Sequence, residues 1–339
     1  MPNMYEYFVA QGINLVKVDG LFSFIVPDRL GFNSQFVNLR KRILSETKIN
    51  ILLYKPPFPN ITADTLIFVF TKSKNNLDHR IVVSEFKKGK IYRLQNDYST
   101  DETLKFFYYE NPEAEQVISK IETSMTRPLI YFFQTTSGFG GKSTLITPNR
   151  VNDKQIAVIK GDSINRYRFI KTYYFVFEKK NITGRTTDKQ KLGAIPKILL
   201  RKTGDKIIAT YDDSGVYPEQ SLYFLFNKTA KMNCLYFLGV LNSKLLNKYF
   251  QTKSLTNKNS IAQVKKVDLD KLPIRDIDFL NTTDLSGHDM IVSLVTRMLD
   301  LHKLTPATPQ EQERLAREIA STDREIDRLV YELYVLTEE

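Results

Sequence analysis

Basic and amide side chains gather in the turns of the middle part of this sequence. Arginine and lysine can bind phosphate groups or the edge of guanine, and asparagine and glutamine can read adenine. A single side chain of this kind is more often a solvated surface charge, so the clustering carries the signal. The residues predicted to contact DNA are Lys142, Lys160, Arg166, Arg168, Lys197, Arg201, Lys202, Gln220, Lys258 and Asn259.

The charge of the chain is concentrated in the same stretch. Residues 126–280 carry 27 basic and 12 acidic side chains, a net charge of +15, whereas residues 1–125 carry +2 and residues 281–339 carry −6. A field of this sign attracts a phosphate backbone through counterion release and electrostatic steering. We expect double-stranded DNA as the partner, the alternative being a basic surface kept for solubility. Replacing Arg166, Arg201 and Lys202 with alanine is expected to flatten the salt dependence of binding.

A second motif is Lys55-Pro56-Pro57-Phe58. It resembles the Asn/Asp-Pro-Pro-aromatic loop of amino-methyltransferases, in which the first residue accepts hydrogen bonds from the target amine. The ammonium of Lys55 can only donate. We therefore do not assign this motif as a catalytic loop.

The run Ser-Gly-Phe-Gly-Gly-Lys-Ser-Thr at residues 137–144 is rich in glycine. It resembles a phosphate-binding P-loop, but Thr136 stands in the place of the first glycine. Pro148 also follows too soon for the helix whose N-terminus should hold the phosphate. We predict a Gly-rich turn whose backbone N–H groups can reach a DNA phosphate, with Lys142 beside it.

Asp28, Glu85 and Lys87 could be the two carboxylates and the lysine of a metal-dependent nuclease. Such residues often occur together by chance, and the alternative is a strand-end aspartate beside a solvated charge run. Loss of magnesium-dependent cleavage on mutation of Glu85 would support the nuclease hypothesis.

The composition is that of a globular protein with two or three domains, since 42% of the 339 residues are hydrophobic and 26% are charged. The single cysteine, Cys234, excludes an internal disulfide, and three scattered histidines do not suggest a zinc site. No apolar run approaches the ~20 residues of a membrane span, and the N-terminus lacks a signal-peptide pattern. We expect a cytoplasmic protein with no membrane partner.

Residues 1–75 have the pattern of a layered α/β unit. The predicted elements are helices over 4–18 and about 33–45 and strands over 21–26, 49–54 and 65–71. Three strands are few for a self-sufficient sheet of this class. The unit is therefore expected to be half of a larger domain, followed by a connector over residues 76–125.

Residues 126–280 contain short, irregular strands bounded by turn signals, with one apolar helix at 233–250, which is typical of an α+β domain. Residues 281–339 predict an antiparallel helical hairpin turned at 305–308. Thr308, Pro309 and Glu311 have the pattern of a capping box at the start of its second helix. Apolar residues at alternating spacings of four and three predict a coiled-coil seam: Leu315, Ile319, Thr322, Ile326, Leu329, Leu333 and Leu336.

Taken in order, several segments resemble the C-terminal part of a gamma-class adenine-N6 DNA methyltransferase of a type IIG-like restriction-modification system, with a TaqI-like specificity (target-recognition) domain. Residues 22–27 and 58–67 are similar to methyltransferase segments that follow the catalytic loop. The remaining matches are residues 159–167, 196–204 and 238–246, similar to three blocks of the specificity domain, and residues 317–334, similar to the closing helix.

The resemblance implies a fold class: a partial Rossmann-like α/β methyltransferase half, an α+β target-recognition domain, and a C-terminal helical hairpin or coiled coil. It also implies that an aromatic at the place of Phe58 lines the pocket for an extruded adenine, which suits base flipping. Core packing is the alternative for Phe58.

The family's cofactor loop and Asn-Pro-Pro-aromatic loop lie upstream of the segments matched here. The chain is therefore expected to bind no S-adenosylmethionine and to be inactive alone, although the complete enzyme would use that cofactor. Its further partner would be the missing N-terminal methyltransferase half or a modification subunit. The alternatives are a non-enzymatic DNA specificity subunit, favoured by the coiled-coil pattern, and the metal-dependent nuclease.

Overall fold

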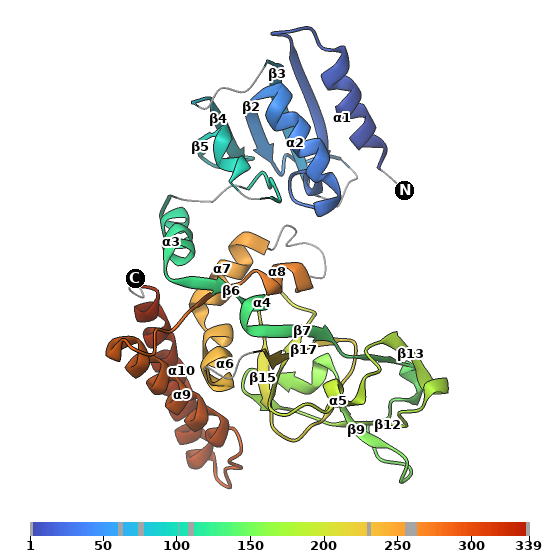
Figure 1. Ribbon diagram of the computed structural model, residues 1–339, viewed down its shortest axis with the longest axis vertical. Helices are drawn as coiled ribbons and strands as arrows, with labels where there is room; N and C mark the ends of the chain where they lie inside the picture. Colours follow the sequence, from blue (N-terminus) through green and yellow to red (C-terminus); the bar gives the residue numbers. More distant parts are fainter. Residues whose placement is uncertain are drawn as a thin grey trace. The chain divides into compact units, whose positions relative to one another are not determined.

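The computed structural model describes residues 3–59, 64–73, 78–100, 102–107, 112–228, 232–254 and 263–336, with backbone alone for 112–115 and 254. The chain forms two compact units, Met1–Glu110 and a larger one made of Asn111–Leu255 and Ile261–Glu339. Each unit is described by itself, and Figure 1 labels the elements of both.

The first unit is a mixed five-stranded sheet with helices packed on one face. Its strands lie in the order β1-β3-β2-β4-β5, and β3 is antiparallel to both β1 and β2 whereas β2 and β4 are parallel. The elements are α1 (Met4–Leu15), β1 (Leu21–Pro27), α2 (Val37–Glu46), β2 (Thr47–Tyr54), β3 (Thr65–Lys72), β4 (Arg80–Glu85) and β5 (Lys90–Leu94), with short 3-10 turns at Asp28–Gly31, Ser34–Phe36 and Gln95–Ser99.

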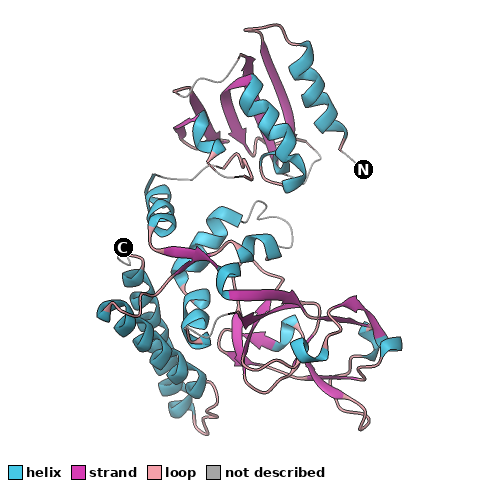
Figure 2. Ribbon diagram, viewed as in Figure 1, coloured by secondary structure: helices cyan, strands magenta, loops and turns pink. Residues whose placement is uncertain are grey.

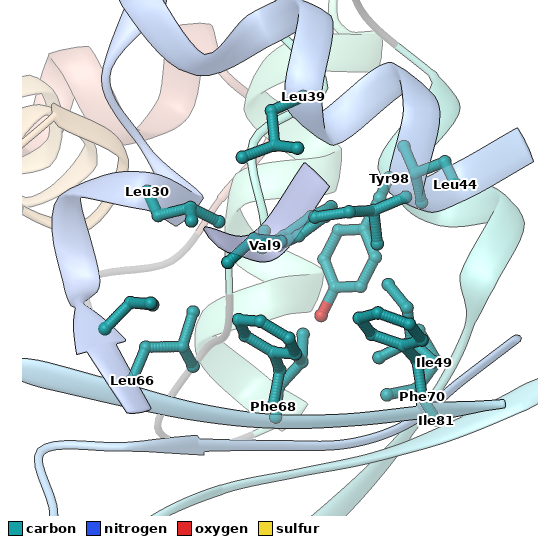
Figure 3. Packing of buried hydrophobic residues seen from close by; sticks show 14 of the residues in the cluster. Val9, Leu30, Leu39, Leu44, Ile49, Leu66, Phe68, Phe70, Ile81 and Tyr98 are labelled. Carbon is teal, nitrogen blue, oxygen red and sulfur yellow. The ribbon is translucent and has the colours of Figure 1, made fainter. Parts of the chain in front are cut away.

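Buried and partly exposed residues alternate along β3, and this alternation shows which face of the sheet packs against the core. Leu66, Phe68 and Phe70 are buried, whereas Ile67 and Val69 between them are half-buried. Because successive strand residues point to opposite faces, one face of the sheet is packed and the other remains partly solvated. Figure 3 shows Val9 of α1 and Leu39 of α2 pointing toward Phe68 and Phe70 across this layer.

The expectation of a three-stranded unit ending near residue 75 is corrected by β4 and β5. Strand β4 pairs in parallel with β2, and its Ile81 and Val83 are fully buried in the same core. The buried Gln95 amide accepts from Ile49 N–H at 2.7 Å and donates to the Thr47 carbonyl at 2.7 Å. Residues that were expected to form a connector are therefore part of the first unit.

The second unit is an α+β domain built on several short antiparallel pairings. Its main sheet has the order β15-β14-β17-β7, and a three-stranded sheet β12-β9-β16 packs beside it around Phe139, Phe175, Leu199 and Phe224. The strands are β7 (Phe133–Ser137), β8 (Phe139–Gly141), β9 (Ile156–Ile159), β10 (Ile164–Asn165), β11 (Arg168–Phe169), β12 (Tyr173–Phe175), β13 (Ile182–Arg185), β14 (Lys197–Arg201), β15 (Ala209–Asp212), β16 (Tyr217–Pro218) and β17 (Leu222–Asn227). A further pair joins β6 (Thr126–Pro128) to β18 (Pro273–Arg275).

Helices make up the rest of the second unit (Figure 2). The single apolar helix expected at 233–250 is two helices, because Ser243 is extended between them and its Oγ accepts from Leu246 N–H. The helices are α3 (Pro112–Thr123), α4 (Leu129–Phe132), α5 (Lys189–Leu192), α6 (Cys234–Asn242), α7 (Lys244–Ser254), α8 (Lys266–Asp270), α9 (Thr282–Leu301) and α10 (Pro309–Leu333).

The last two helices lie side by side as a hairpin (Figure 1). The capping box is confirmed, since Thr308 Oγ1 accepts from Glu311 N–H and the Glu311 carboxylate accepts from Thr308 N–H. Thr322, Ile326 and Leu329 of the predicted seam are buried. Gly239 lets α6 approach closely, because a Cβ there would lie 2.8 Å from Ile291 of α9.

Candidate nucleic-acid interface

Three strand ends meet at one edge of the main sheet. Strands β7 and β14 are both antiparallel to β17, so they run in the same direction and end where β17 begins. The residues just beyond these ends are therefore neighbours, although they are far apart in sequence. Strand β13 joins them by pairing with β8, which follows β7 after Gly138. We call this group the strand-end cluster, and its side chains come from Ser137, Thr183, Arg185, Lys202, Gln220 and Tyr223.

Lys202 lies at the centre of the strand-end cluster. Its Nζ donates to Ser137 Oγ and to the Gln220 carbonyl, and it lies 4.5 Å from the centroid of the Tyr223 ring. Burial, followed by the positive charge of Arg185, lowers the pKa of Lys202 to about 8, whereas Glu219 opposes the shift. Two cations are thus close enough to repel one another, an arrangement that a bound anion would relieve.

Glycines shape the backbone of this edge. A Cβ on Gly138 would lie 2.3 Å from the carbonyl oxygens of both Pro218 and Glu219, so only glycine fits there. A Cβ on Gly140 would lie 2.9 Å from Thr183 Oγ1 and 3.2 Å from Gln220 Oε1. The Gly-rich run therefore forms the end of β7, a tight bend at Gly138 and β8. The helix that a P-loop requires is not there, since only a three-residue 3-10 turn follows at Ser143–Leu145.

Arg185 was not predicted, and its placement is unusual. It ends β13 in the left-handed region with φ 65°, next to Gly184 with φ 146°, and the pairing of β13 with β8 is irregular between Ile182 and Gly184. Bulges of this kind redirect side chains and are common beside functional sites. The glycine inside a strand-like stretch, immediately before an arginine, is the sequence signal that could have indicated this residue.

Lys197 is the clearest correction among the predicted DNA contacts. It is 0% exposed and forms an ion pair with Asp212, which is also 0% exposed. Its Nζ donates in addition to the Ala194 carbonyl at 2.9 Å. A charge enclosed in this way does not reach a phosphate on the surface, so we assign Lys197 a structural role.

Arg166 and Arg201 also use their guanidinium groups within the protein. Arg166 makes a bidentate ion pair with Asp323 of α10, at 2.9 and 2.6 Å. Arg201 donates from Nε to the Gly161 carbonyl at 2.8 Å and from Nη2 to the Ile164 carbonyl. These contacts hold the β9–β11 region in place, so the expectation that both arginines bind phosphates is replaced by a structural assignment.

The other predicted contacts are distributed as follows. Lys142, Arg168 and Gln220 are exposed, and Lys160 is half-buried with its Nζ 4.7 Å from the Tyr173 ring centroid. Gln220 and Lys202 lie in the strand-end cluster, whereas Arg168 lies near His302, whose pKa is lowered by burial and then by Arg168. Lys258 and Asn259 lie outside the described residues.

In the first unit, Phe58 is 46% exposed, which does not fit the alternative of core packing. The nuclease hypothesis is not favoured, and its two carboxylates are paired or buried within the protein. Glu85 faces Lys55 at 3.2 Å and Lys88 at 3.1 Å, and Asp28 is 5% exposed. Burial, and then the nearby Asp64, raise the pKa of Asp28 to about 7.

Two absences apply to the described part of the chain. No group of three histidine, cysteine, aspartate or glutamate side chains there could hold a metal ion. Nor does any helix in those same ranges combine the length and the apolarity needed to cross a bilayer.

Comparison with known proteins bears on the second unit. Residues 156–274 match the family described as TaqI-like C-terminal specificity domain. The matches support a specificity domain of a restriction-modification system. Over 297 residues the chain is 23% identical to a putative type II restriction enzyme and methyltransferase of Methanocaldococcus jannaschii, covering 80% of this chain and 25% of that protein.

Two solved structures show the same fold at low identity. The type IIL restriction-modification enzyme MmeI in complex with DNA has a TM-score of 0.58 at 10% identity, over 99% of this chain and 49% of that one. A nuclease-deletion mutant of the type ISP enzyme LlaGI in complex with a DNA substrate mimic has a TM-score of 0.50 at 11% identity, over 90% and 32%. The chain thus spans about half or less of these proteins and a quarter of the curated relative.

Proposed function

We propose that this chain is the sequence-specific DNA-recognition part of a restriction-modification enzyme. The observation that carries the proposal is that residues 156–274 match a specificity domain and contain most of the strand-end cluster. Lys202 and Arg185 have no ion pair with an acid among the described residues. Cations of this kind are available to DNA phosphates, whereas Lys197 and Arg166 are not.

The test is selection from a random duplex library by the purified full chain, with sequencing of the bound fraction at two salt concentrations. We expect enrichment of one short asymmetric site, and a ratio of specific to non-specific affinity that persists at the higher salt. Binding without enrichment of any sequence, or with an affinity equal to that for competitor DNA, would overturn the proposal.

We further propose that the complete enzyme transfers a methyl group from S-adenosylmethionine to adenine N6, and that the first unit is the C-terminal half of its catalytic domain. Support comes from the β1 edge of the sheet. Strand β1 pairs on one side with β3, and beside it α1 exposes Tyr7, Phe8 and Leu15 by 56, 57 and 74%. A long strand edge and an apolar helix face are normally covered in a finished domain.

In this proposal, the 46% exposure of Phe58 leaves its ring available to stack on an extruded adenine. The cofactor would be held by a loop that this sequence does not contain, so we assign no cofactor contact to it. Joining the chain to a methyltransferase half, covalently or as a separate modification subunit, should restore adenine methylation. Phe58→Ala should then lower kcat more than it lowers DNA affinity.

A non-enzymatic specificity subunit remains the second candidate, and the hairpin of α9 and α10 favours it because a long helix pair can space or dock partner subunits. Purification of the native protein separates the two. A single polypeptide carrying both this chain and an Asn-Pro-Pro-aromatic loop supports the fused enzyme, whereas co-purification of a separate methyltransferase chain supports the subunit.

A further inference from the structure

The strand-end cluster contains two cations whose charges are not matched. Arg185 is exposed, Lys202 is half-buried, and neither has an acidic partner within 4.0 Å in the described ranges. Glu219 is an acid that acts on Lys202, but its Oε2 accepts hydrogen bonds from the N–H and the Oγ–H of Ser221, the former at 2.8 Å. The cluster therefore has a surplus of positive charge at a fixed place.

The donors of Lys202 are only partly used. An ammonium group has three N–H donors, and within the described residues two of them go to Ser137 Oγ and to the Gln220 carbonyl. The Tyr223 ring at 4.5 Å covers another side of the group. These contacts hold Nζ in position and leave one donor for an acceptor from outside the protein.

The backbone at Arg185 is held in an uncommon conformation. A left-handed φ costs a non-glycine residue on the order of 1 kcal/mol or more, and it persists only where the surrounding structure requires it. Arg185 pairs with the buried Phe139 of β8, directly after the irregularity between Ile182 and Gly184. Gly184, the residue before Arg185, and Gln220 meet at Gly140, where an added Cβ would lie 3.1 Å from the Gly184 carbonyl and 3.2 Å from Gln220 Oε1. Because Lys202 Nζ donates to the Gln220 carbonyl, this contact brings the exposed Arg185 to the side of the half-buried Lys202, 17 residues along the chain.

We propose that Arg185 and Lys202 together hold one phosphodiester group of the DNA backbone at the end of β7 and β14. The arginine would supply a planar pair of donors and the lysine a point charge, a combination that suits a phosphate oxygen pair. This inference rests on the proposed function and names two residues of the same interface that contact one shared phosphate.

The test measures DNA affinity of the full chain as a function of salt for Arg185→Ala, Lys202→Ala and the double variant. Each phosphate contact contributes about 0.9 to the log-log slope. Because the two residues share a phosphate, we expect the double variant to flatten the slope by about one unit and each single variant to flatten it by no more than that. A double variant that loses about two units, or one whose slope is unchanged, would overturn the shared site.

Controls separate binding from folding. Lys180→Ala removes an exposed lysine that pairs with Glu178 at 2.9 Å, and it should leave the slope unchanged. Arg185→Lys and Lys202→Arg keep the charges and should keep most of the slope. Urea unfolding of every variant checks that the fold is intact, and Lys202→Arg tests the site even if Lys202→Ala does not fold.

Ethylation interference gives a second, independent measurement. One ethylated phosphate should weaken binding by the original chain and should have no further effect on the double variant. If the original chain binds a specific site and no phosphate behaves in this way, the shared site is wrong while the proposed function stands. If the original chain selects no sequence at all, the proposed function itself fails.

Discussion

Two basic regions of the second unit differ in whether their cations form ion pairs with acidic side chains. Near the hairpin, Arg166 forms a two-oxygen pair with Asp323, and Asp327 lies close enough to act on both. At the strand-end cluster, Arg185 and Lys202 lie near one another with no such acid in the described residues. The first region uses its charge to join parts of the protein, and the second leaves its charge for a partner.

The acidic character of residues 281–339 explains the difference. Their net charge of −6 lies largely on α9 and α10, and α10 is where Asp323 and Asp327 meet the recognition domain. Part of the +15 of residues 126–280 is thus neutralised inside the unit. Counting charges along a sequence overstates the field that a ligand meets, and only the unpaired fraction steers DNA.

The largest effect should come from Lys197→Ala. Removing the lysine leaves the Asp212 carboxylate buried with no counter-charge, and breaking such a pair costs about 3–5 kcal/mol. We expect a large drop in the urea midpoint. Lys142→Ala, at an exposed site, is the control and should leave stability unchanged. Normal stability of Lys197→Ala together with weakened DNA binding would return Lys197 to the interface.

Gly138→Ala should come next, with a cost of about 1–3 kcal/mol from overpacking. The added Cβ would lie 2.3 Å from the carbonyl oxygens of Pro218 and Glu219, so these two residues must move away from the end of β7. DNA affinity should fall with stability because Gln220, whose carbonyl accepts from Lys202, directly follows the displaced residues. Gly89→Ala is the matched control, since nothing lies within 4 Å of its Cβ. Equal stabilities of the two variants would contradict the predicted strain.

Arg166→Ala should destabilise the protein by about 1–2 kcal/mol, less than a fully buried pair because both partners remain partly solvated. The salt dependence of DNA binding should not change, in contrast to Arg185→Ala. A double-mutant cycle with Asp323→Ala measures the coupling between the two side chains. A flattened salt slope in Arg166→Ala would show that this region also contacts phosphate.

The smallest effect concerns pH. Lys202 is charged below its pKa of about 8, and the groups that act on it are Arg185 and Glu219, with the Tyr223 ring against it. As pH rises from 7 to 9 the ammonium loses its proton, so DNA affinity should weaken by a few-fold, equivalent to about 1 kcal/mol. Lys202→Arg should remove this dependence, because the guanidinium stays charged. A pH profile shared by both proteins would assign the effect to another group.

The same pKa gives a stability effect of opposite sign. The folded-state pKa of Lys202 lies below its unfolded value, so the unfolded chain binds more protons between these two values. Stability should therefore rise as pH increases from about 8 toward the usual pKa of lysine. Lys202→Arg should not show this rise. Measuring the urea midpoint over that range checks the sign.

Local signals in the sequence predicted local structure well. The capping box of Thr308 and Glu311 is confirmed, and so is the burial of the seam residues Ile326 and Leu329. These features could be predicted because each depends on residues only three or four positions away in the sequence. The rejection of Lys55-Pro56-Pro57-Phe58 as a catalytic loop, made from the donor chemistry of Lys55, stays a prediction. In the structure the Lys55 ammonium faces Glu85.

The sequence could not indicate which lysines and arginines are paired inside the protein and which remain exposed. Lys197 and Lys202 lie five positions apart in and just after the same strand, yet one is enclosed with Asp212 and the other reaches the edge of the sheet. Their neighbours come from β15 and from the loop before β17, and such short strands carry little information on register. Arg185 was missed for the same reason, since its neighbours are 17 or more residues away.

The pairing of Arg166 with Asp323 limits how recognition domains can be exchanged between related proteins. Lys244 strengthens the limit, because its backbone N–H donates to Asp327 at 2.8 Å and its Nζ lies 3.3 Å from the same carboxylate. A graft that transplants residues 126–280 alone would separate these partners. It would leave unpaired charges both on the grafted segment and on the helices that receive it. Chimaeras that carry the closing helices along with the recognition segment should express and fold better than those that do not.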